Sequence, residues 1–342
     1  MKTFITDDFL LCNNIAKELY FNVAKDLPII DYHNHLDPKL ILKNVNFENI
    51  TEAWLNGDHY KWRAMRANGV HEDYITGNKS DYEKFVKWAE TVPYTLGNPL
   101  FHWAHLELLR YFNIDVSINK SSAPSIWEKT KALLQQPEYS VRSLLQEGNV
   151  EFIDTTDDPT DSLDAHISLE REGFDIKVSP SFRPDRALLI EDENFLAWVK
   201  ELGEVTGLLI ENYDTFLQAL EKRVNFFDDC GCRSSDHGID VMFFQNTTKN
   251  EVNTIYNKRI KEEKLTEDEI EKFKTYTLLH LGELYYDKGW AMQLHLGAIR
   301  NNNKRMYEKL GPDTGYDSIG DFHLASKLSS FLDSLEQQNK LP

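Results

Sequence analysis

The 342-residue chain is long enough for two ordinary domains or one large barrel, and its composition, 41% hydrophobic and 27% charged, is typical of a soluble globular protein. Its formal net charge of -18, with no stripe of lysine and arginine, excludes a general nucleic-acid-binding protein. No run of eighteen apolar residues occurs, and the amino-terminal stretch MKTFITDDFLLCNN lacks the features of a signal peptide. We therefore expect a cytoplasmic protein that has no membrane partner.

The first predicted strand is the short apolar run Pro28 to Ile30, which lies in the stretch DLPIIDYHNHLDP at residues 26–38. Alternate side chains of a strand share a face, so His33 and His35 are expected to project the same way and Asn34 the opposite way. Two imidazoles that point together predict a metal site. A hydrogen-bonded structural role is the alternative for each histidine.

Residues 48–146 are rich in helical patterns and poor in strand patterns, and we expect a helical insertion within a single domain that spans residues 1–342. Within the insertion, the stretch WLNGDHYKWRAMRANGV at residues 54–70 combines aromatic side chains with arginines, which need partners on a helix surface. The pattern alone leaves open whether this stretch belongs to a site or packs as a structural element.

After residue 148 the chain changes to short apolar strands, each followed by polar residues, with helical patterns between several of them. Such alternation indicates parallel β-α units, whose ligand-binding groups gather at the carboxyl ends of the strands. The four stretches are NVEFIDTTDDP, DIKVSPSFRPD, FFDDCGCRSSDHGID and WAMQLHLGAIRNNN.

One long helix is predicted between the last two of these strands. Thr266 and Glu269 form the pattern of a capping box, and Gly289 suits the helix end. His280 lies inside this helix, where we expect it to be structural.

The polar residues that follow these strands supply the other candidate site residues. Arg183 and Arg186 are suited to binding a carboxylate, with surface ion pairs as the alternative. His237 and His295 each lie near a strand end, and either can join His33 and His35 in a zinc site with about three protein ligands. His295 is preferred because Met292, Leu294 and Leu296 alternate with it along its strand.

Seven separated stretches, in matching order from the amino terminus to about residue 340, resemble the uronate isomerase family, also called glucuronate isomerase. They are DDFLLCNNIAKELYFNVAKDLPIIDYHNHL, WLNGDHYKWRAMRANGV, NPLFHWAHLELLRYF, TTDDP, SFRPD, GCRSSDHGID and MQLHLGAIRNNNKRMYEKLGPDTGYDSIGD. The resemblance implies an α/β fold, a distorted TIM-like (β/α)8 barrel of the amidohydrolase superfamily. It also implies interconversion of D-glucuronate with D-fructuronate and of D-galacturonate with D-tagaturonate, assisted by a divalent metal such as zinc.

The resemblance also implies roles for particular residues. The metal motif falls on His33 and His35, although family members commonly carry cysteine where this chain has Asn34. The tyrosine that the family places near the substrate falls on Tyr60, with His59 beside it. For the implied reaction we expect Tyr60 or His59 to transfer protons, and Arg183 or Arg300 to hold the uronate carboxylate. Members of the family are longer, so the last barrel strands, with an Asp-x-Arg motif, are expected to be missing from these 342 residues.

Two other functions remain possible from the sequence. One is metal-assisted hydrolysis, as in most of the superfamily, and the other is an inactive barrel fragment that binds sugar acids or only contacts proteins. An uncovered barrel edge favours self-association, so we also expect a homo-oligomer.

Overall fold

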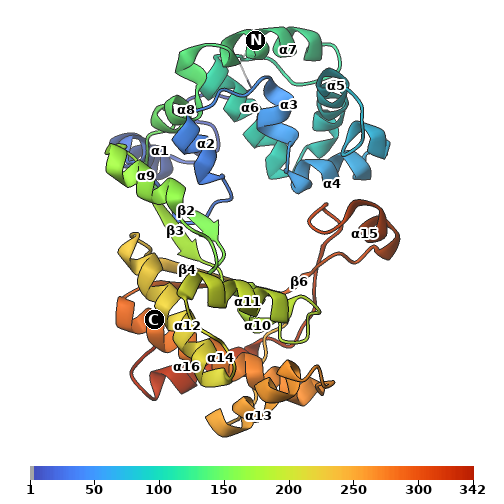
Figure 1. The fold of residues 1–342 in the computed structure, drawn as a ribbon. Coiled ribbons are helices and arrows are strands. Elements are labelled where there is room, and N and C mark those ends of the chain that lie inside the picture. The colour runs from blue at the N-terminus through green and yellow to red at the C-terminus, as the bar shows by residue number, and fades with distance from the viewer. Residues whose placement is uncertain (1–3) are drawn as a thin grey trace. The chain divides into compact units, whose positions relative to one another are not determined.

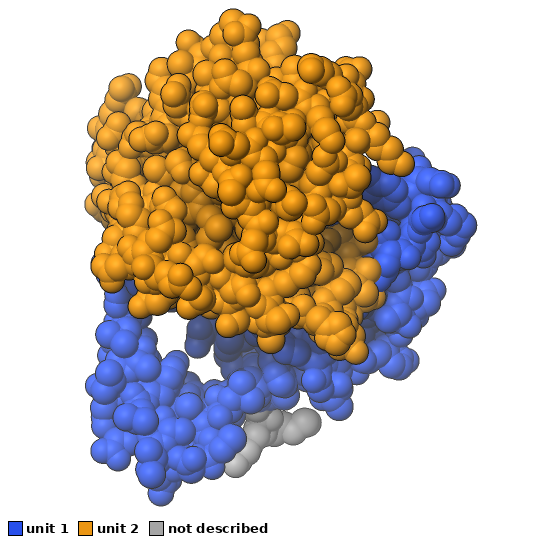
Figure 2. Space-filling model, turned by 90° about the horizontal axis from the view of Figure 1, so that it is seen from below, with its two compact units in different colours: residues 1–30, 39–151, 301–317 blue, residues 31–38, 152–300, 318–342 orange. Residues whose placement is uncertain are grey.

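The computed structural model describes residues 4–342, which divide into two compact units (Figures 1 and 2). Of the described residues, unit 1 comprises 4–30, 39–151 and 301–317, and unit 2 comprises 31–38, 152–300 and 318–342. The expectation of one barrel domain with a helical insertion at 48–146 stays a prediction. All of residues 48–146 belong to unit 1.

Unit 1 is helical. Its helices are α1 (Asn14–Asn22), α2 (Pro38–Lys43, whose first residue belongs to unit 2), α3 (Ile50–Leu55), α4 (His59–Ala67), α5 (Asp81–Thr91), α6 (Pro99–Phe112), α7 (Ala123–Leu134), α8 (Val141–Glu147) and α15 (Lys304–Leu310). Helix α5 shows why such segments fold: Ser80 and Glu83 form a capping box at its start, and Phe85, Trp88 and Ala89 are fully buried on one face. These three side chains belong to the core of unit 1.

Unit 2 contains most of the parallel sheet. Strands β1 (Ile29–Asp31), β2 (Val150–Asp157), β3 (Lys177–Phe182), β4 (Ser234–Ile239) and β5 (Ala291–Leu296) lie in the order β1-β2-β3-β4-β5, and each pair from β2 to β5 is parallel. This curled half-barrel sheet confirms the predicted α/β class. The four strands predicted after residue 148 are confirmed as β2 to β5.

The helices of unit 2 follow the strands. They are α9 (Asp164–Glu172), α10 (Asp185–Leu188), α11 (Phe195–Thr206), α12 (Tyr213–Asp229), α13 (Lys249–Ile260), α14 (Glu267–Lys288) and α16 (Ala325–Glu336), and a small antiparallel pair joins β6 (Ala298–Ile299) to β7 (Ser318–Ile319). Helix α14 confirms the predicted long helix, with the Thr266–Glu269 capping box and Gly289 in the left-handed conformation at its end. No helix within residues 4–342 is both long enough and apolar enough to cross a membrane.

The core of unit 2 fixes the direction of the β5 side chains. Met292, Leu294 and Leu296 pack against a buried cluster that includes Ile239 of β4 and Phe331 of α16. Because side chains alternate along a strand, Gln293 and His295 face the other side of the sheet. The predicted alternation of β5 is therefore confirmed.

Candidate active site

Three side chains from separate parts of unit 2 converge on one point. His33 follows β1, Asp236 lies in β4 and His295 lies in β5, and one possible ligand atom from each lies within 4.8 Å of the others. Asp236 Oδ1 is 2.5 Å from His295 Nε2, and Asp236 Oδ2 is 3.8 Å from His33 Nδ1. The ring centroids of His33 and His295 are 4.6 Å apart. Among residues 4–342, these three side chains form the group whose ligand atoms lie close enough together to hold a metal ion.

The two predicted histidines of the first motif lie just beyond their strand. β1 ends at Asp31, so the expectation that His33 and His35 lie within it is wrong. The backbone N–H of Asn34 still donates to Asp154 O on β2 at 3.0 Å, which ties this segment to the sheet. The Asn34 side chain donates to Asp31, and the rings of His33 and His35 lie 5.0 Å apart. His35 is therefore a neighbour of the three converging groups.

His237 lies apart from that group, although it follows Asp236 directly. Adjacent residues of β4 face opposite sides of the sheet, and the His237 ring is fully buried with its centroid 5.7 Å from that of Tyr285. Burial lowers the pKa of His237 to about 3, so its ring is neutral at ordinary pH. The structure thus brings His33 and His295 together and leaves His237 in the core.

The donor set suits a divalent metal. His33 Nδ1 is buried and has no hydrogen-bond partner among the described protein atoms, and the buried Asp236 Oδ1 faces His295 Nε2 at 2.5 Å without forming a hydrogen bond. Such atoms are costly to leave unsatisfied, and a bound ion would satisfy both. Two imidazole nitrogens and one carboxylate oxygen form a ligand set that zinc accepts while keeping an open position. Burial also lowers the pKa of His33, which favours the neutral form that binds metals.

Arg183 holds Asp236 in place. Its Nη1 donates to Asp236 Oδ2 at 2.9 Å and its Nε donates to Asp185 Oδ2 at 2.8 Å, while Asp185 accepts from the N–H of Gly238. A Cβ atom at Gly238 would lie only 2.8 Å from Arg183 Nη2 and from Asp185 Oδ2, so a side chain there would displace these two groups. Arg183, the residue that follows β3, thus orients the Asp236 carboxylate.

The other two predicted arginines also belong to unit 2. Arg186 donates to Glu201 at 3.1 Å, and its guanidinium lies 5.8 Å from the ring centroid of Trp198. Arg300 lies 3.9 Å from Asp240. Both side chains are more exposed than that of Arg183. Their role toward a carboxylate stays a prediction.

His59 and Tyr60 occupy the first turn of α4 in unit 1. The Asp58 carboxylate accepts from the backbone N–H groups of Tyr60 and Lys61 and so caps the helix. The rings of His59 and Tyr60 meet edge to face, with centroids 4.7 Å apart, and Tyr60 is 65% exposed.

Asp236 is the site residue that the sequence reasoning missed. The stretch SSDHGID contains both an aspartate and a histidine, and a histidine draws attention as a ligand when the strand direction is unknown. The useful signal is the alternation of β4, which places Asp236 and His237 on opposite faces.

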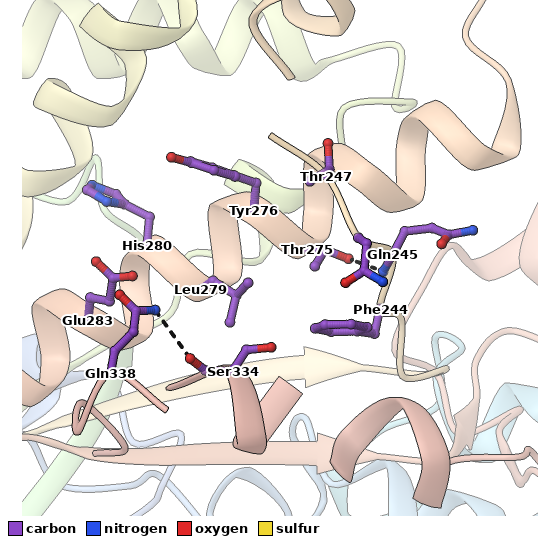
Figure 3. Close-up of a pocket in the computed structure, with 11 residues that line it drawn as sticks. Phe244, Gln245, Thr247, Thr275, Tyr276, Leu279, His280, Glu283, Ser334 and Gln338 are labelled. Atoms are coloured by element: carbon purple, nitrogen blue, oxygen red, sulfur yellow. Dashed lines mark hydrogen bonds between the residues drawn. The ribbon is translucent and has the colours of Figure 1, made fainter. Parts of the chain in front are cut away.

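A separate cavity of about 370 Å³ lies elsewhere in unit 2 (Figure 3). It is bordered by the segment that begins at Phe244 and by helices α14 and α16, and His280, Glu283 and Gln338 lie together at one end. Gln338 Nε2 donates to Ser334 O, and the buried His280 Nε2 has no hydrogen-bond partner among the described protein atoms. None of the predicted site residues lines this cavity.

Comparison with known proteins identifies the family. The glucuronate isomerase family model matches residues 1–342. Uronate isomerases from Caldicellulosiruptor saccharolyticus and Bacillus licheniformis are 56% and 53% identical over 100% of this chain, which spans 74% and 72% of their lengths. The crystal structure of uronate isomerase from Thermotoga maritima matches with a TM-score of 0.94 and 37% identity, over 99% of this chain and 74% of that one. The chain therefore belongs to the glucuronate isomerase family.

Proposed function

We propose that this protein interconverts D-glucuronate with D-fructuronate and D-galacturonate with D-tagaturonate. The observation that carries the proposal is the convergence of His33, Asp236 and His295 in a chain whose full length matches the glucuronate isomerase family. The relatives named above are uronate isomerases, which supports the same substrate class here.

We further propose that zinc is the metal and that His33, Asp236 and His295 hold it. When bound, such an ion acts as a Lewis acid on the sugar carbonyl and the adjacent hydroxyl. His35 lies beside this group, and Arg183 keeps the Asp236 carboxylate in one orientation through its 2.9 Å hydrogen bond. Residues that orient a ligand in this way usually tune metal affinity.

The protein side chains supply the proton transfers. An aldose becomes a ketose when a proton leaves C2 and another is delivered to C1, and a positioned acid and base carry both steps. We assign this role to Tyr60, with His59 beside it. Arg183 and Arg300 are the side chains proposed for the uronate carboxylate, with Arg186 as a further candidate, because a guanidinium donates several hydrogen bonds to carboxylates. Since Nε and Nη1 of Arg183 already donate to Asp185 and Asp236, Nη2 is the group that it would offer to the substrate.

A substrate panel tests the proposal. The zinc-loaded protein is incubated with D-glucuronate, with D-galacturonate and with simple lactones and amides, and the products are followed by carbon-13 NMR. The proposal predicts a ketose carbonyl signal from the two uronates and no hydrolysis of the lactones or amides. Hydrolysis without ketose formation would instead identify a metal-dependent hydrolase.

We also propose that the protein works in the cytoplasm as a homo-oligomer. Light scattering coupled to size-exclusion chromatography, on the protein at micromolar concentration, tests the second part. A mass equal to that of the single 39.9 kDa chain at all concentrations would contradict it.

A further inference from the structure

Within unit 1, a segment from late in the sequence packs on helix α4. Residues 301–317 belong to unit 1, although the residues before and after them in the sequence, Arg300 and Ser318, belong to unit 2. This segment contains α15 and the turn that follows it. Asn302 N–H donates to Tyr316 O, and Asn301 N–H donates to the Asp317 carboxylate, so the two ends of the segment are hydrogen-bonded to each other. The segment is thus a closed loop.

Arg66, near the end of α4, links this loop to the rest of unit 1. Its Nη1 donates to Thr314 O, while Nε and Nη2 donate to the two oxygens of Glu72 at 2.9 and 2.7 Å. The guanidinium lies 4.3 Å from the ring centroid of Tyr316, whose hydroxyl donates to Glu72 at 3.4 Å. We call Arg66, Glu72 and Tyr316 the Arg66 cluster.

The Arg66 cluster is built as a rigid group. The side chains of Arg66 and Glu72 are each only 13% exposed. A two-pronged contact between a guanidinium and a carboxylate fixes geometry as well as charge, and stacking on an aromatic ring restrains the guanidinium plane. Burial opposes ionisation of Glu72, but its bonds from Arg66, Thr76 and Tyr316 lower its pKa overall.

The same turn touches the first residue of α4. Gly315 has φ of +85°, and a Cβ atom there would lie 2.6 Å from the backbone O of His59 and 3.2 Å from Arg66 Nη1. Only glycine therefore allows the turn to lie this close to the His59 backbone. Gly311, in the same segment, has φ of +83° but no atom within 4 Å of such a Cβ.

We propose that Arg66 is a positioning residue for the His59–Tyr60 pair: the Arg66 cluster holds the Thr314–Tyr316 turn against the His59 backbone and so fixes the first turn of α4. This inference rests on the proposed function of Tyr60. The Tyr60 side chain is 65% exposed, so its placement depends on the helix backbone more than on neighbouring side chains. Proton transfer depends on such placement, because an error of about 1 Å can cost roughly 100-fold in rate.

Two matched glycine variants test the proposal. Gly315→Ala and Gly311→Ala place the same side chain at nearly the same positive φ, +85° and +83°, but only the first meets His59. We expect Gly315→Ala to lower kcat by about 10-fold or more with KM changed by less than about 3-fold, whereas Gly311→Ala changes both by less than about 3-fold. Equal kcat values for the two variants would overturn the proposal.

Two further measurements separate positioning from a general effect on folding. In a Tyr60→Phe background, Gly315→Ala should lower kcat by no more than about 2-fold, because the positioned group is already gone. Full additivity of the two losses would contradict a role through Tyr60. Arg66→Lys, which keeps the charge but loses the two-pronged contact, should reproduce the kcat loss of Gly315→Ala if the alanine variant fails to fold.

Hydrogen exchange separates failure of this inference from failure of the proposed function. The backbone amides of residues 59–62 should exchange faster in Gly315→Ala than in Gly311→Ala, whether or not the protein isomerises uronates. Unchanged exchange in both variants would overturn the inference. Faster exchange in a protein without isomerase activity would show that the turn holds α4 but would overturn its catalytic purpose.

Discussion

Asp236 Oδ1 lies 2.5 Å from His295 Nε2, although the two residues are not opposite each other in the sheet. Gly238 of β4 pairs with His295 of β5, so Asp236 reaches the histidine diagonally, two residues away. The absence of a side chain at Gly238 leaves room for Arg183 and Asp185 beside it. A fully buried carboxylate, held by Arg183 and facing an imidazole, is the centre of the proposed metal site.

Asp236→Asn should weaken zinc binding. The substitution keeps the shape of the side chain but removes the negative charge that would face the ion, so we expect zinc affinity to fall by about 100-fold or more. Isothermal titration of the metal-free protein with zinc measures this loss. Asp175→Asn, at an exposed site, is the control and should bind as the unaltered protein does. Equal affinities for the two variants would remove Asp236 from the site.

His295→Ala and His237→Leu should separate the two histidines of the neighbouring strands. His295 belongs to the converging group, so its loss should lower the zinc content measured by mass spectrometry after dialysis against micromolar zinc. His237 is fully buried, and its ring nitrogens have no hydrogen-bond partner among the described protein atoms. Its replacement by leucine should retain the zinc and change the free energy of unfolding by no more than about 2 kcal/mol. Loss of zinc in His237→Leu alone would reverse the assignment.

Tyr60→Phe should reduce turnover without affecting stability. The phenol is largely exposed, so the melting temperature should stay within about 2 °C of the unaltered value, in line with the small effects of surface substitutions. Loss of a positioned acid or base costs about 100- to 10,000-fold in kcat. Steady-state kinetics with D-glucuronate measures the effect. Wild-type turnover in the phenylalanine variant would exclude Tyr60 from proton transfer.

Asp157 should make stability depend on pH. Burial raises the pKa of Asp157 from 3.8 to about 7, although Thr155 donates a hydrogen bond to it. Between these values the unfolded state is ionised and the folded state is protonated, so this group makes the free energy of unfolding fall as pH rises from about 4 to about 7. Asparagine does not ionise, so Asp157→Asn does not lose stability in this way. Between about pH 4 and pH 7, the free energy of unfolding of Asp157→Asn should therefore rise relative to that of the unaltered protein by a few kcal/mol, at about 1.4 kcal/mol per pKa unit.

Urea denaturation at pH 4.5 and pH 7.5 measures this difference. The exposed Asp175→Asn variant serves as the control, and its stability relative to the unaltered protein should be the same at both pH values. If the stability difference between Asp157→Asn and the unaltered protein is the same at both pH values, the Asp157 carboxyl is ionised in the folded protein at pH 4.5. If the stability of Asp157→Asn relative to the unaltered protein falls as pH rises, the Asp157 carboxyl does not have a raised pKa in the folded protein.

Local patterns in the sequence predicted much of the fold. The capping box at Thr266 and the left-handed Gly289 set the ends of α14, and the alternation of Met292, Leu294 and Leu296 set the buried face of β5. Each depends on interactions between near neighbours, which a single sequence contains. β1 ends at Asp31, although the predicted strand extended to His33 and His35. Beyond Asp31, the backbone N–H of Asn34 donates to β2, but the residues do not continue the strand.

The site was less accessible to such reasoning. His33 and His295 could be chosen from the motifs, but Asp236 depends on which face of β4 meets β5 and on the diagonal register between them. The Arg66 cluster joins residues about 250 positions apart, and no local pattern predicts that Tyr316 stacks on Arg66. Tertiary packing determines both arrangements.

The decisive measurement for the proposed metal site is the initial rate of ketose formation from D-glucuronate as zinc is added to the metal-free protein. We expect the rate to rise with zinc, to saturate near one ion per chain, and to be lost in Asp236→Asn at the same zinc concentration. Ketose formation that is equally fast without zinc, or that is unchanged in Asp236→Asn, would show that the site of His33, Asp236 and His295 is not the catalytic metal site.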